Sequence, residues 1–165
     1  MPSLKGALLD EELLTYLRES RVGYLATMNE DGQAHIVPVV FASDEKGIYF
    51  VVDNKRKNRR VGKLRRIENI ERTGRATFLV DTYSEDWTKL SFLLTYCRAR
   101  VLSSSQDREK KKEIASLLKE KYPQYAGMYG EKEYFPEPDN ATFVWLEPER
   151  TTFWSEEKEE ALPKT

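Results

Sequence analysis

The stretch DNKRKNRRVGKLRR, residues 53–66, holds the side chains with the most distinctive chemistry. It contains eight Lys or Arg and one acid, whereas the whole chain of 165 residues has a formal net charge of −1. Because the stretch contributes a net +7, everything outside it sums to −8. Arg binds phosphate through two parallel hydrogen bonds and Lys binds it as a point charge. Three uses of this charge are open: a nucleic acid, a compact phosphate on a small ligand, or water alone.

The composition of the rest of the chain disfavours nucleic-acid binding, a zinc site and catalysis by protein side chains alone. A protein that coats a nucleic-acid backbone is more often basic over a whole face, so the acidic remainder disfavours nucleic acid. One histidine, His35, and one cysteine, Cys97, are too few for a Cys/His zinc site, and no metal is expected. No Ser/His/Asp or Cys/His arrangement emerges, so no catalytic residue can be named. In an enzyme of this kind, a cofactor would carry the chemistry and the protein would orient it.

Turn and capping residues, together with the spacing of apolar residues, predict the helices and strands of the first half of the chain. Asp10 is an N-cap candidate for a short amphipathic helix over DEELLTYLRES. The segments VGYLATM, AHIVPVVFA and IYFVV, separated by two turns, predict a three-stranded antiparallel meander over residues 22–52. Pro38 cannot donate to a ladder, so the second strand should lie at an edge or carry a bulge, with free backbone groups near Pro38.

The second half alternates in the same way. Apolar residues at three-residue spacing predict a helix over residues 58–70, ended by a C-cap at Gly74. Strands are expected over 75–82 and 89–102, a helix over 107–122, and a final strand pair over 141–148 and 151–154. The expected organisation is a single domain, residues 1–155, and a disordered C-terminal tail, residues 156–165.

Many short strands without a βαβ alternation predict a mainly β fold, an antiparallel barrel with flanking helices. The basic stretch, residues 53–66, connects the end of a predicted strand to the start of a predicted helix. In the first turn of that helix, Lys57, Arg59 and Arg60 would oppose the helix dipole, and a bound phosphate would compensate. The later cations Lys63 and Arg65–Arg66 are expected to be ordinary charges on the helix face.

The order and spacing of several segments resemble a known superfamily. GYLATMNEDGQAHIVPVVF, then IYFVVDNKRKNRR, then LRRIENIERTGRATFLVD and YSEDW resemble the pyridoxamine 5'-phosphate oxidase-like FMN-binding split barrels over about residues 18–102. Within that superfamily, KRK followed by LRRIEN and VDTYSEDW resembles most the branch of F-420 (deazaflavin)-dependent enzymes.

This resemblance implies a six-stranded antiparallel split β-barrel that forms a homodimer. FMN or F-420 would lie at the subunit interface, with its phosphate on the basic pair Arg56 and Lys57. The backbone of the strand before the basic stretch would face the phosphate and ribityl chain, and residues 37–40 would run along the ring. The implied cofactor-binding residues are Lys55, Arg56, Lys57, Asn58, Phe50, Val51, Val52, Val37, Pro38, Val39, Val40 and Trp87.

Two departures from the oxidases bear on the function. The chain ends in TTFWSEEKEEALPKT in place of the arginine- and histidine-bearing region that holds their substrate, so vitamin B6 chemistry is not expected. Apolar Ile36 or Val37 stands where the oxidases carry a basic residue, which favours deazaflavin over FMN.

The leading hypothesis is an oxidoreductase that transfers a hydride between bound FMN or F-420 and a small-molecule substrate. Val39, Phe41 and Trp87 would wall off the ring. Alternatives are a non-catalytic flavin or deazaflavin carrier or sensor, and a small nucleic-acid-binding β-barrel. The roles of His35 and of a tyrosine-rich segment, residues 122–134, stay open between ligand contact and packing.

The N-terminus and hydropathy bear on location. Acids stand where a signal peptide would have its apolar core, and no apolar run approaches the roughly 18 residues of a membrane span. The sequence therefore predicts a cytoplasmic protein that has no membrane partner.

Overall fold

One curled antiparallel sheet forms the body of the molecule. The computed structural model describes residues 4–5, 9–53, 63–103, 105–126 and 141–160. Within these residues the sheet order is β3-β2-β6-β7-β8-β5-β4, and β1 pairs with β8. The strands are β1 (Leu4–Lys5), β2 (Gly23–Met28), β3 (Ala34–Val39), β4 (Ala42–Asp44), β5 (Gly47–Asp53), β6 (Arg75–Thr82), β7 (Ser91–Val101) and β8 (Ala141–Ser155).

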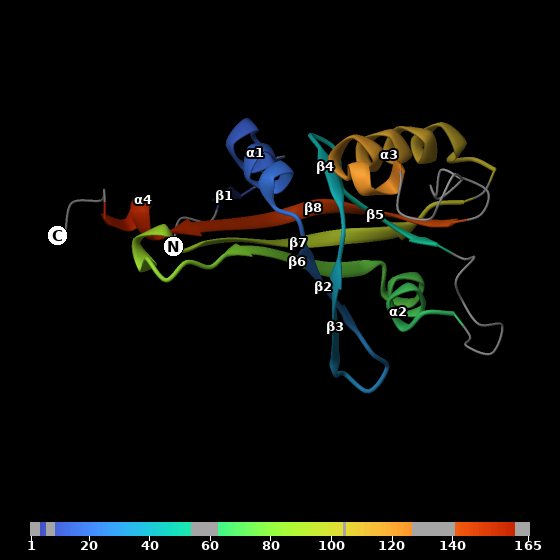
Figure 1. Cartoon of the computed structure of the whole chain (residues 1–165). Helices are drawn as coiled ribbons and strands as arrows, with labels where there is room; N and C mark the ends of the chain where they lie inside the picture. Colours follow the sequence, from blue (N-terminus) through green and yellow to red (C-terminus); the bar gives the residue numbers. More distant parts are fainter. Residues whose placement is uncertain (1–3, 6–8, 54–62, 104, 127–140, 161–165) are drawn as a thin grey trace.

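Helices flank this sheet. They are α1 (Glu11–Glu19), α2 (Arg65–Thr73), α3 (Arg108–Lys121) and α4 (Glu156–Glu160), with the 3-10 turns η1 (Trp87–Lys89) and η2 (Pro123–Ala126). Figure 1 shows the long strands β6, β7 and β8 side by side, with α1 and α3 over one side and α2 near the end of the curled sheet. The mainly β antiparallel half-barrel with flanking helices is thus confirmed. No helix of the described residues is long and apolar enough to span a membrane.

The first helix forms as its sequence predicts. The Asp10 side chain accepts a hydrogen bond from the Leu13 N–H at 2.9 Å, which satisfies one free donor at the helix start. Leu13, Leu14 and Leu17 are buried on one face. Their burial fixes α1 against the concave side of the sheet, where they join the main core cluster.

The predicted three-stranded meander is wrong. β3 pairs with β2, but the chain then leaves this pair, because β4 pairs with β5 and β5 pairs with β8. Adjacent hairpins in the sequence therefore lie at the two ends of the strand order. The prediction that Pro38 lies in an edge strand is confirmed, since β3 ends the sheet.

The predicted final strand pair is a single strand of 15 residues, β8. Its register with β7 shifts between Tyr96, which faces Arg150, and Cys97, which faces Pro148. The extra residue, Glu149, makes a bulge that lets the strand pass its proline without turning. The expected disordered tail differs as well: residues Glu156–Glu160 form α4, whose first N–H bonds the Leu90 carbonyl at 3.0 Å, and residues 161–165 lie outside the described part.

Candidate functional site

Among the described residues, no strand pairs with the outer edge of β3, so this edge presents unpaired backbone groups. The Asn29 N–H donates to the Gln33 carbonyl at 2.9 Å and so closes the β2–β3 hairpin. Because hydrogen-bonded pairs alternate along an antiparallel ladder, His35, Val37 and Val39 bond to β2, whereas the backbone of Ala34, Ile36 and Pro38 faces outward. The backbone nitrogen of Pro38 therefore faces the unpaired side of β3, so the missing N–H costs no hydrogen bond to β2. The outward carbonyls of Ile36 and Pro38 are available to a ligand.

The start of α2 supplies a basic counterpart. The helix begins at Arg65, with Leu64 extended at the N-cap, so the predicted start at residue 58 is wrong. The cations in its first turn are Arg65 and Arg66, which the sequence had suggested to be ordinary charges farther along the helix. Arg65 pairs with Glu68 at 3.7 Å and is exposed. The Arg66 Nε is buried without a partner among the described residues, and burial lowers the pKa of its guanidinium.

Hydrogen bonds fix α2 to the β2–β3 hairpin. The buried Asn69 amide donates to the Thr27 hydroxyl at 3.0 Å and to the Asn29 side-chain oxygen at 2.9 Å, and Arg72 donates to the Met28 carbonyl. Arg66 lies three residues before Asn69 and therefore on the same face of α2. This face is turned toward β2, so the helix holds Arg66 on the hairpin side.

The His35 side chain lies on the same side of the sheet as Thr27, which contacts α2. It pairs in register with Thr27, and its Nδ1 is buried without a partner among the described residues. We call the four side chains Thr27, His35, Arg66 and Asn69 the β3–α2 corner. Two of them keep unused nitrogen atoms, and an unpaired buried polar atom is costly unless a ligand satisfies it.

The structure separates the predicted cofactor residues into groups. Lys55, Arg56, Lys57 and Asn58 lie outside the described residues. Val39, Phe50 and Val52 are buried in one core cluster together with Phe41, and Val37 packs against it. Val51 packs against a second cluster, whereas Pro38 and Val40 are exposed.

These burials decide what each residue can offer. Because the side chains of Phe50 and Val52 fill the core, only their backbone could meet a ligand. Val39 and Phe41 are 8% and 0% exposed, so their side chains pack in the core of one chain, and the expectation that they border a cofactor ring stays a prediction. Their alternation along the chain places them on the inner face of the barrel, where they hold β3 and its neighbours together.

Trp87 lies apart from the β3–α2 corner within one chain. It is 69% exposed and begins η1, the turn that contacts α4 through the bond from Glu156 to Leu90. Figure 1 places α4 and α2 at opposite ends of the sheet. One chain therefore does not bring Trp87 together with residues 37–40.

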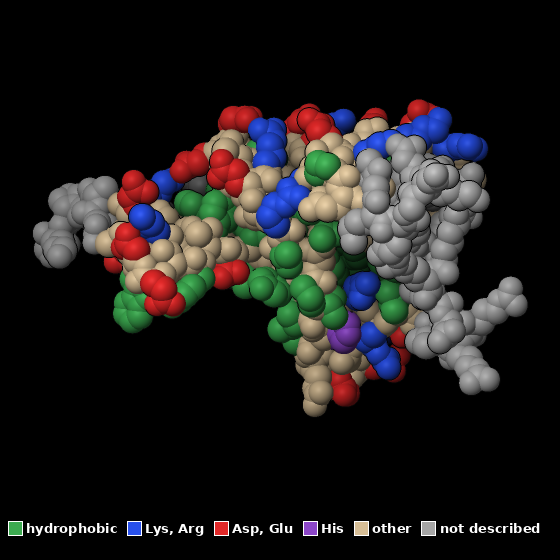
Figure 2. All heavy atoms as spheres, in the orientation of Figure 1, with side chains coloured by type: hydrophobic (Ala, Val, Ile, Leu, Met, Phe, Trp, Pro, Cys, Tyr) green, Lys and Arg blue, Asp and Glu red, His purple; other side chains and the backbone are tan. Residues whose placement is uncertain are grey.

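The outer face of the sheet is unusually apolar. Side chains that alternate outward from β2, β3 and β7 include Tyr24, Met28, Ile36 and Tyr96, which are 40%, 47%, 62% and 40% exposed. Figure 2 shows hydrophobic side chains gathered over the hairpin end of the molecule. A contiguous apolar patch of this kind is typical of an interface. We call these four residues the outer face.

The other chemically notable residues serve packing. Burial raises the pKa of the Cys97 thiol to about 12, so it stays protonated and unreactive. The Tyr122 hydroxyl lies 2.9 Å from the Phe41 carbonyl and 3.0 Å from that of Arg21, which ties α3 to the sheet. Residues 127–134 of the tyrosine-rich segment lie outside the described residues. No group of three or more His, Cys, Asp or Glu in the described ranges could hold a metal.

Comparison with known proteins adds the family. A family model described as pyridoxamine 5'-phosphate oxidase matches residues 9–155. A search of curated proteins finds no match.

Several solved structures share the fold. The conserved hypothetical protein Rv2991 from Mycobacterium tuberculosis is 20% identical, with a TM-score of 0.68 over 98% of this chain and 94% of that one. The heme storage protein HutZ from Vibrio cholerae is 13% identical, with a TM-score of 0.62 over 90% and 95%. A FAD-binding protein from Mesorhizobium loti is 18% identical, with a TM-score of 0.61 over 89% and 96%. Identities this low show a common fold alone.

Proposed function

The chain belongs to the pyridoxamine 5'-phosphate oxidase family, and we propose that it is a cytoplasmic, homodimeric oxidoreductase that binds FMN or F-420. Bound flavin or deazaflavin would supply hydride transfer to or from a small-molecule substrate. The chain's own residues bind the cofactor, orient it and keep water from it. The family and the flavin-binding structure that shares the fold support this class of cofactor.

The buried Arg66 Nε, which has no partner among the described residues, carries the proposal. Two arginines in the first turn of α2 oppose the helix dipole, and an anion at this turn would offset that cost. Arg66 has an Nε without a partner in the described part of the chain, and its burial strengthens any charge pair that it makes. We assign Arg66 to the cofactor phosphate, together with Lys55, Arg56, Lys57 and Asn58, which precede it in the sequence.

The edge of β3 would hold the ring. Outward carbonyls at Ile36 and Pro38 can accept hydrogen bonds from the N–H groups of a flavin or deazaflavin ring. His35 is then a candidate donor or acceptor at the inner side of the same strand. The cofactor would supply the redox chemistry, and these groups contribute binding and orientation.

A second copy of the chain would complete the site. The outer face offers the apolar surface that such a partner would cover, and Trp87 would reach a cofactor from the partner subunit. The same contact would bury Ile36, which is 62% exposed in one chain.

Two alternatives keep the same fold. A carrier or sensor would bind the cofactor tightly without substrate-dependent turnover. Heme is a second candidate ligand, because structures that share the fold include a heme storage protein and a heme-binding protein from Mycobacterium smegmatis. A heme held through histidine would require His35, the chain's one histidine.

Titrations of the apo-protein with FMN, F-420 and hemin test the proposal. We expect fluorescence changes to report saturable binding of FMN or F-420, and hemin to give no sharp Soret band. Arg66→Met should weaken cofactor binding about tenfold or more, because it removes a charged hydrogen bond. Arg65→Met removes an exposed cation of the same turn, is the matched control and should weaken binding clearly less. Equal affinity of the two variants, or hemin binding lost in His35→Ala, would overturn the assignment.

A further inference from the structure

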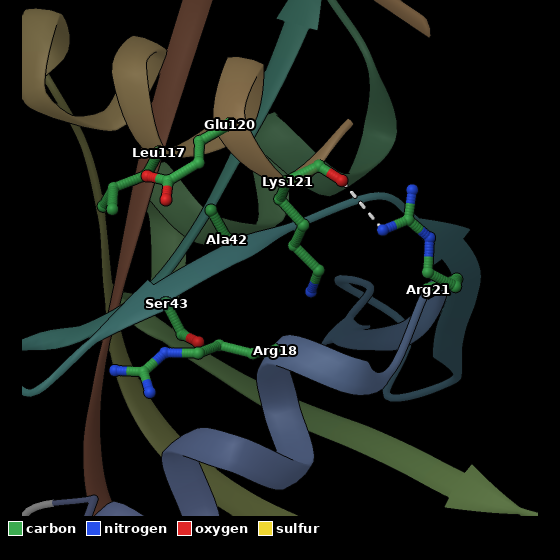
Figure 3. Close-up of a pocket in the computed structure, with 7 residues that line it drawn as sticks. All are labelled: Arg18, Arg21, Ala42, Ser43, Leu117, Glu120 and Lys121. Atoms are coloured by element: carbon green, nitrogen blue, oxygen red, sulfur yellow. Dashed lines mark hydrogen bonds between the residues drawn. The ribbon is translucent and has the colours of Figure 1, made fainter. Parts of the chain in front are cut away.

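A pocket lies between α1, β4 and α3, apart from the proposed cofactor site. Its volume is about 280 Å³, and it is lined by Arg18, Arg21, Ala42, Ser43, Leu117, Glu120 and Lys121. None of these residues belongs to the β3–α2 corner or to the outer face. Three basic residues are among these lining residues. Figure 3 shows Ser43 beside Arg18, the Lys121 amine pointing toward α1, and the Arg21 guanidinium turned to the Lys121 carbonyl.

Ser43 points to an absent ligand. Its side chain is 7% exposed, and its hydroxyl is buried without a hydrogen-bond partner among the described residues. A buried hydroxyl in this condition costs about 1–3 kcal/mol relative to a satisfied one. A ligand oxygen in the pocket would satisfy it.

Lys121 is held in an environment that disfavours its charge. Its Nζ donates to the Leu17 carbonyl at 2.8 Å and lies 3.6 Å from the centre of the Phe41 ring. Burial, and then the charge of Arg21, lower its pKa to about 7. The other charged or titratable groups at this pocket are Arg18 from α1, and Glu120 and Tyr122 at the end of α3.

Arg18 and Arg21 each make contacts within the protein that leave room for a ligand. Arg21 donates to the Lys121 carbonyl at 2.8 Å and stacks on Tyr122 at 4.4 Å. Arg18 pairs with Glu11 at 3.0 Å, but their side chains are 55% and 78% exposed. An exposed pair of this kind is weak and can exchange for a better partner.

Capping of helix ends explains part of this arrangement. Cations near the last carbonyls of α1 and α3 favour the helix dipoles, which accounts for one contact each of Arg21 and Lys121. Capping does not account for the Ser43 hydroxyl, nor for the gathering of Arg18 at the same cavity. A ligand with negatively charged oxygens would explain all of these features.

We infer that this pocket is a second binding site, which holds the phosphate or carboxylate group of a small ligand through Ser43, Lys121 and Arg18. The cavity suits a compact molecule, and Ala42 and Leu117 give it an apolar wall. Glu120, which is exposed, limits the site to ligands of modest charge. Binding takes up a proton above neutral pH, because the anion favours charged Lys121.

Calorimetry with inorganic phosphate and with succinate tests the inference. The full chain is titrated at constant ionic strength and about pH 8, in two buffers of different ionisation enthalpy that count protons. Wild type should bind at least one probe saturably with proton uptake, and the preferred probe separates phosphate from carboxylate. Ser43→Ala should bind about fivefold more weakly, and Lys121→Met about tenfold or more, without proton uptake. Lys112→Met, on the exposed face of α3, should match wild type.

Urea unfolding of the free protein supplies the second readout. Ser43→Ala should be at least as stable as wild type, since its hydroxyl has no partner to lose. Unchanged affinity in both pocket variants, no saturable binding below about 10 mM, or marked destabilisation by Ser43→Ala would each overturn the inference. If Lys121→Met fails to fold, Ser43→Ala decides alone.

Discussion

Buried polar side chains divide into two kinds in this protein. Asn69 uses its amide to bind Thr27 and Asn29, and the Thr95 and Thr151 hydroxyls bond each other at 2.9 Å, so these groups stabilise the fold. Arg66 and Ser43 have polar atoms that no described residue satisfies. The first kind stabilises the fold, and we assign the second kind to the proposed ligand sites.

Asn69→Ala tests the first kind. The substitution removes two hydrogen bonds that fix α2 to the β2–β3 hairpin and leaves Thr27 with a buried, unpaired hydroxyl. We expect a loss of about 1–3 kcal/mol in the free energy of unfolding, measured by urea denaturation. Glu71→Ala, on the exposed side of the same helix, should change it by less than about 0.5 kcal/mol. Equal effects would show that Asn69 does not anchor the helix.

The lowered pKa of Lys121 predicts a pH dependence of stability. Between the folded value, about 7, and the unfolded value, 10.5, the unfolded chain binds more protons than the folded one. The contribution of Lys121 to stability therefore increases as the pH rises through this window, and its full penalty remains below the window. Lys121→Met should lack this increase when its urea midpoints are compared with those of Lys112→Met across the window. Parallel pH profiles would show that Lys121 has an ordinary pKa.

At the scale of elements, the edge position of β3 decides the character of the site. An edge strand risks unwanted pairing, and a proline whose missing N–H faces outward is one of the devices that limit it. Pro38 has this role and leaves its carbonyl free for a ligand. The inner side chains Val37 and Val39 meanwhile fix the strand to the core.

Two proline substitutions test the deduced register of β3. Val37→Pro removes an N–H that bonds to β2, so it should markedly lower the free energy of unfolding. Ile36→Pro removes an outward N–H and should cost clearly less. Urea denaturation of the pair measures the difference. A larger loss for Ile36→Pro would reverse the assigned register.

The sequence predicted elements better than their pairing. Local signals identified the Asp10 cap, the Gly74 C-cap and the edge position of Pro38, because each depends on nearby backbone chemistry. The pairing of β5 with β8 joins residues about ninety positions apart, and no local pattern encodes it. The sequence predicted two final strands, 141–148 and 151–154, but the Glu149 bulge lets them continue as one strand within the sheet.

The candidate site was predictable only in part. Basic composition pointed to the stretch of residues 53–66, but the helix starts later than its periodicity suggested. As a result Arg66, classed as a surface charge, is the described cation that is buried with an unpaired nitrogen. Burial arises from the packing of α2 on the hairpin, which sequence periodicity does not report.

At the scale of the whole molecule, the proposed dimer assigns the outer face to contact with a second copy of the chain. Met28→Glu places a charge on this face and should convert the proposed dimer to a monomer in analytical ultracentrifugation. Ser116→Glu, on the exposed side of α3, is the control and should leave the oligomeric state unchanged. A wild-type protein that sediments as a monomer would contradict the proposed dimer.

We propose above that the basic residues Lys55–Lys57, together with Arg66 at the start of α2, bind the phosphate of a cofactor. The most direct test compares each cofactor with its form without phosphate: FMN with riboflavin, and F-420 with its phosphate-free deazaflavin. We predict that the phosphorylated form of one pair binds wild type about tenfold or more tightly, and that this ratio falls toward one in Lys57→Ala but not in Lys63→Ala. Equal affinities for both forms in wild type, or a ratio preserved in Lys57→Ala, would contradict the account.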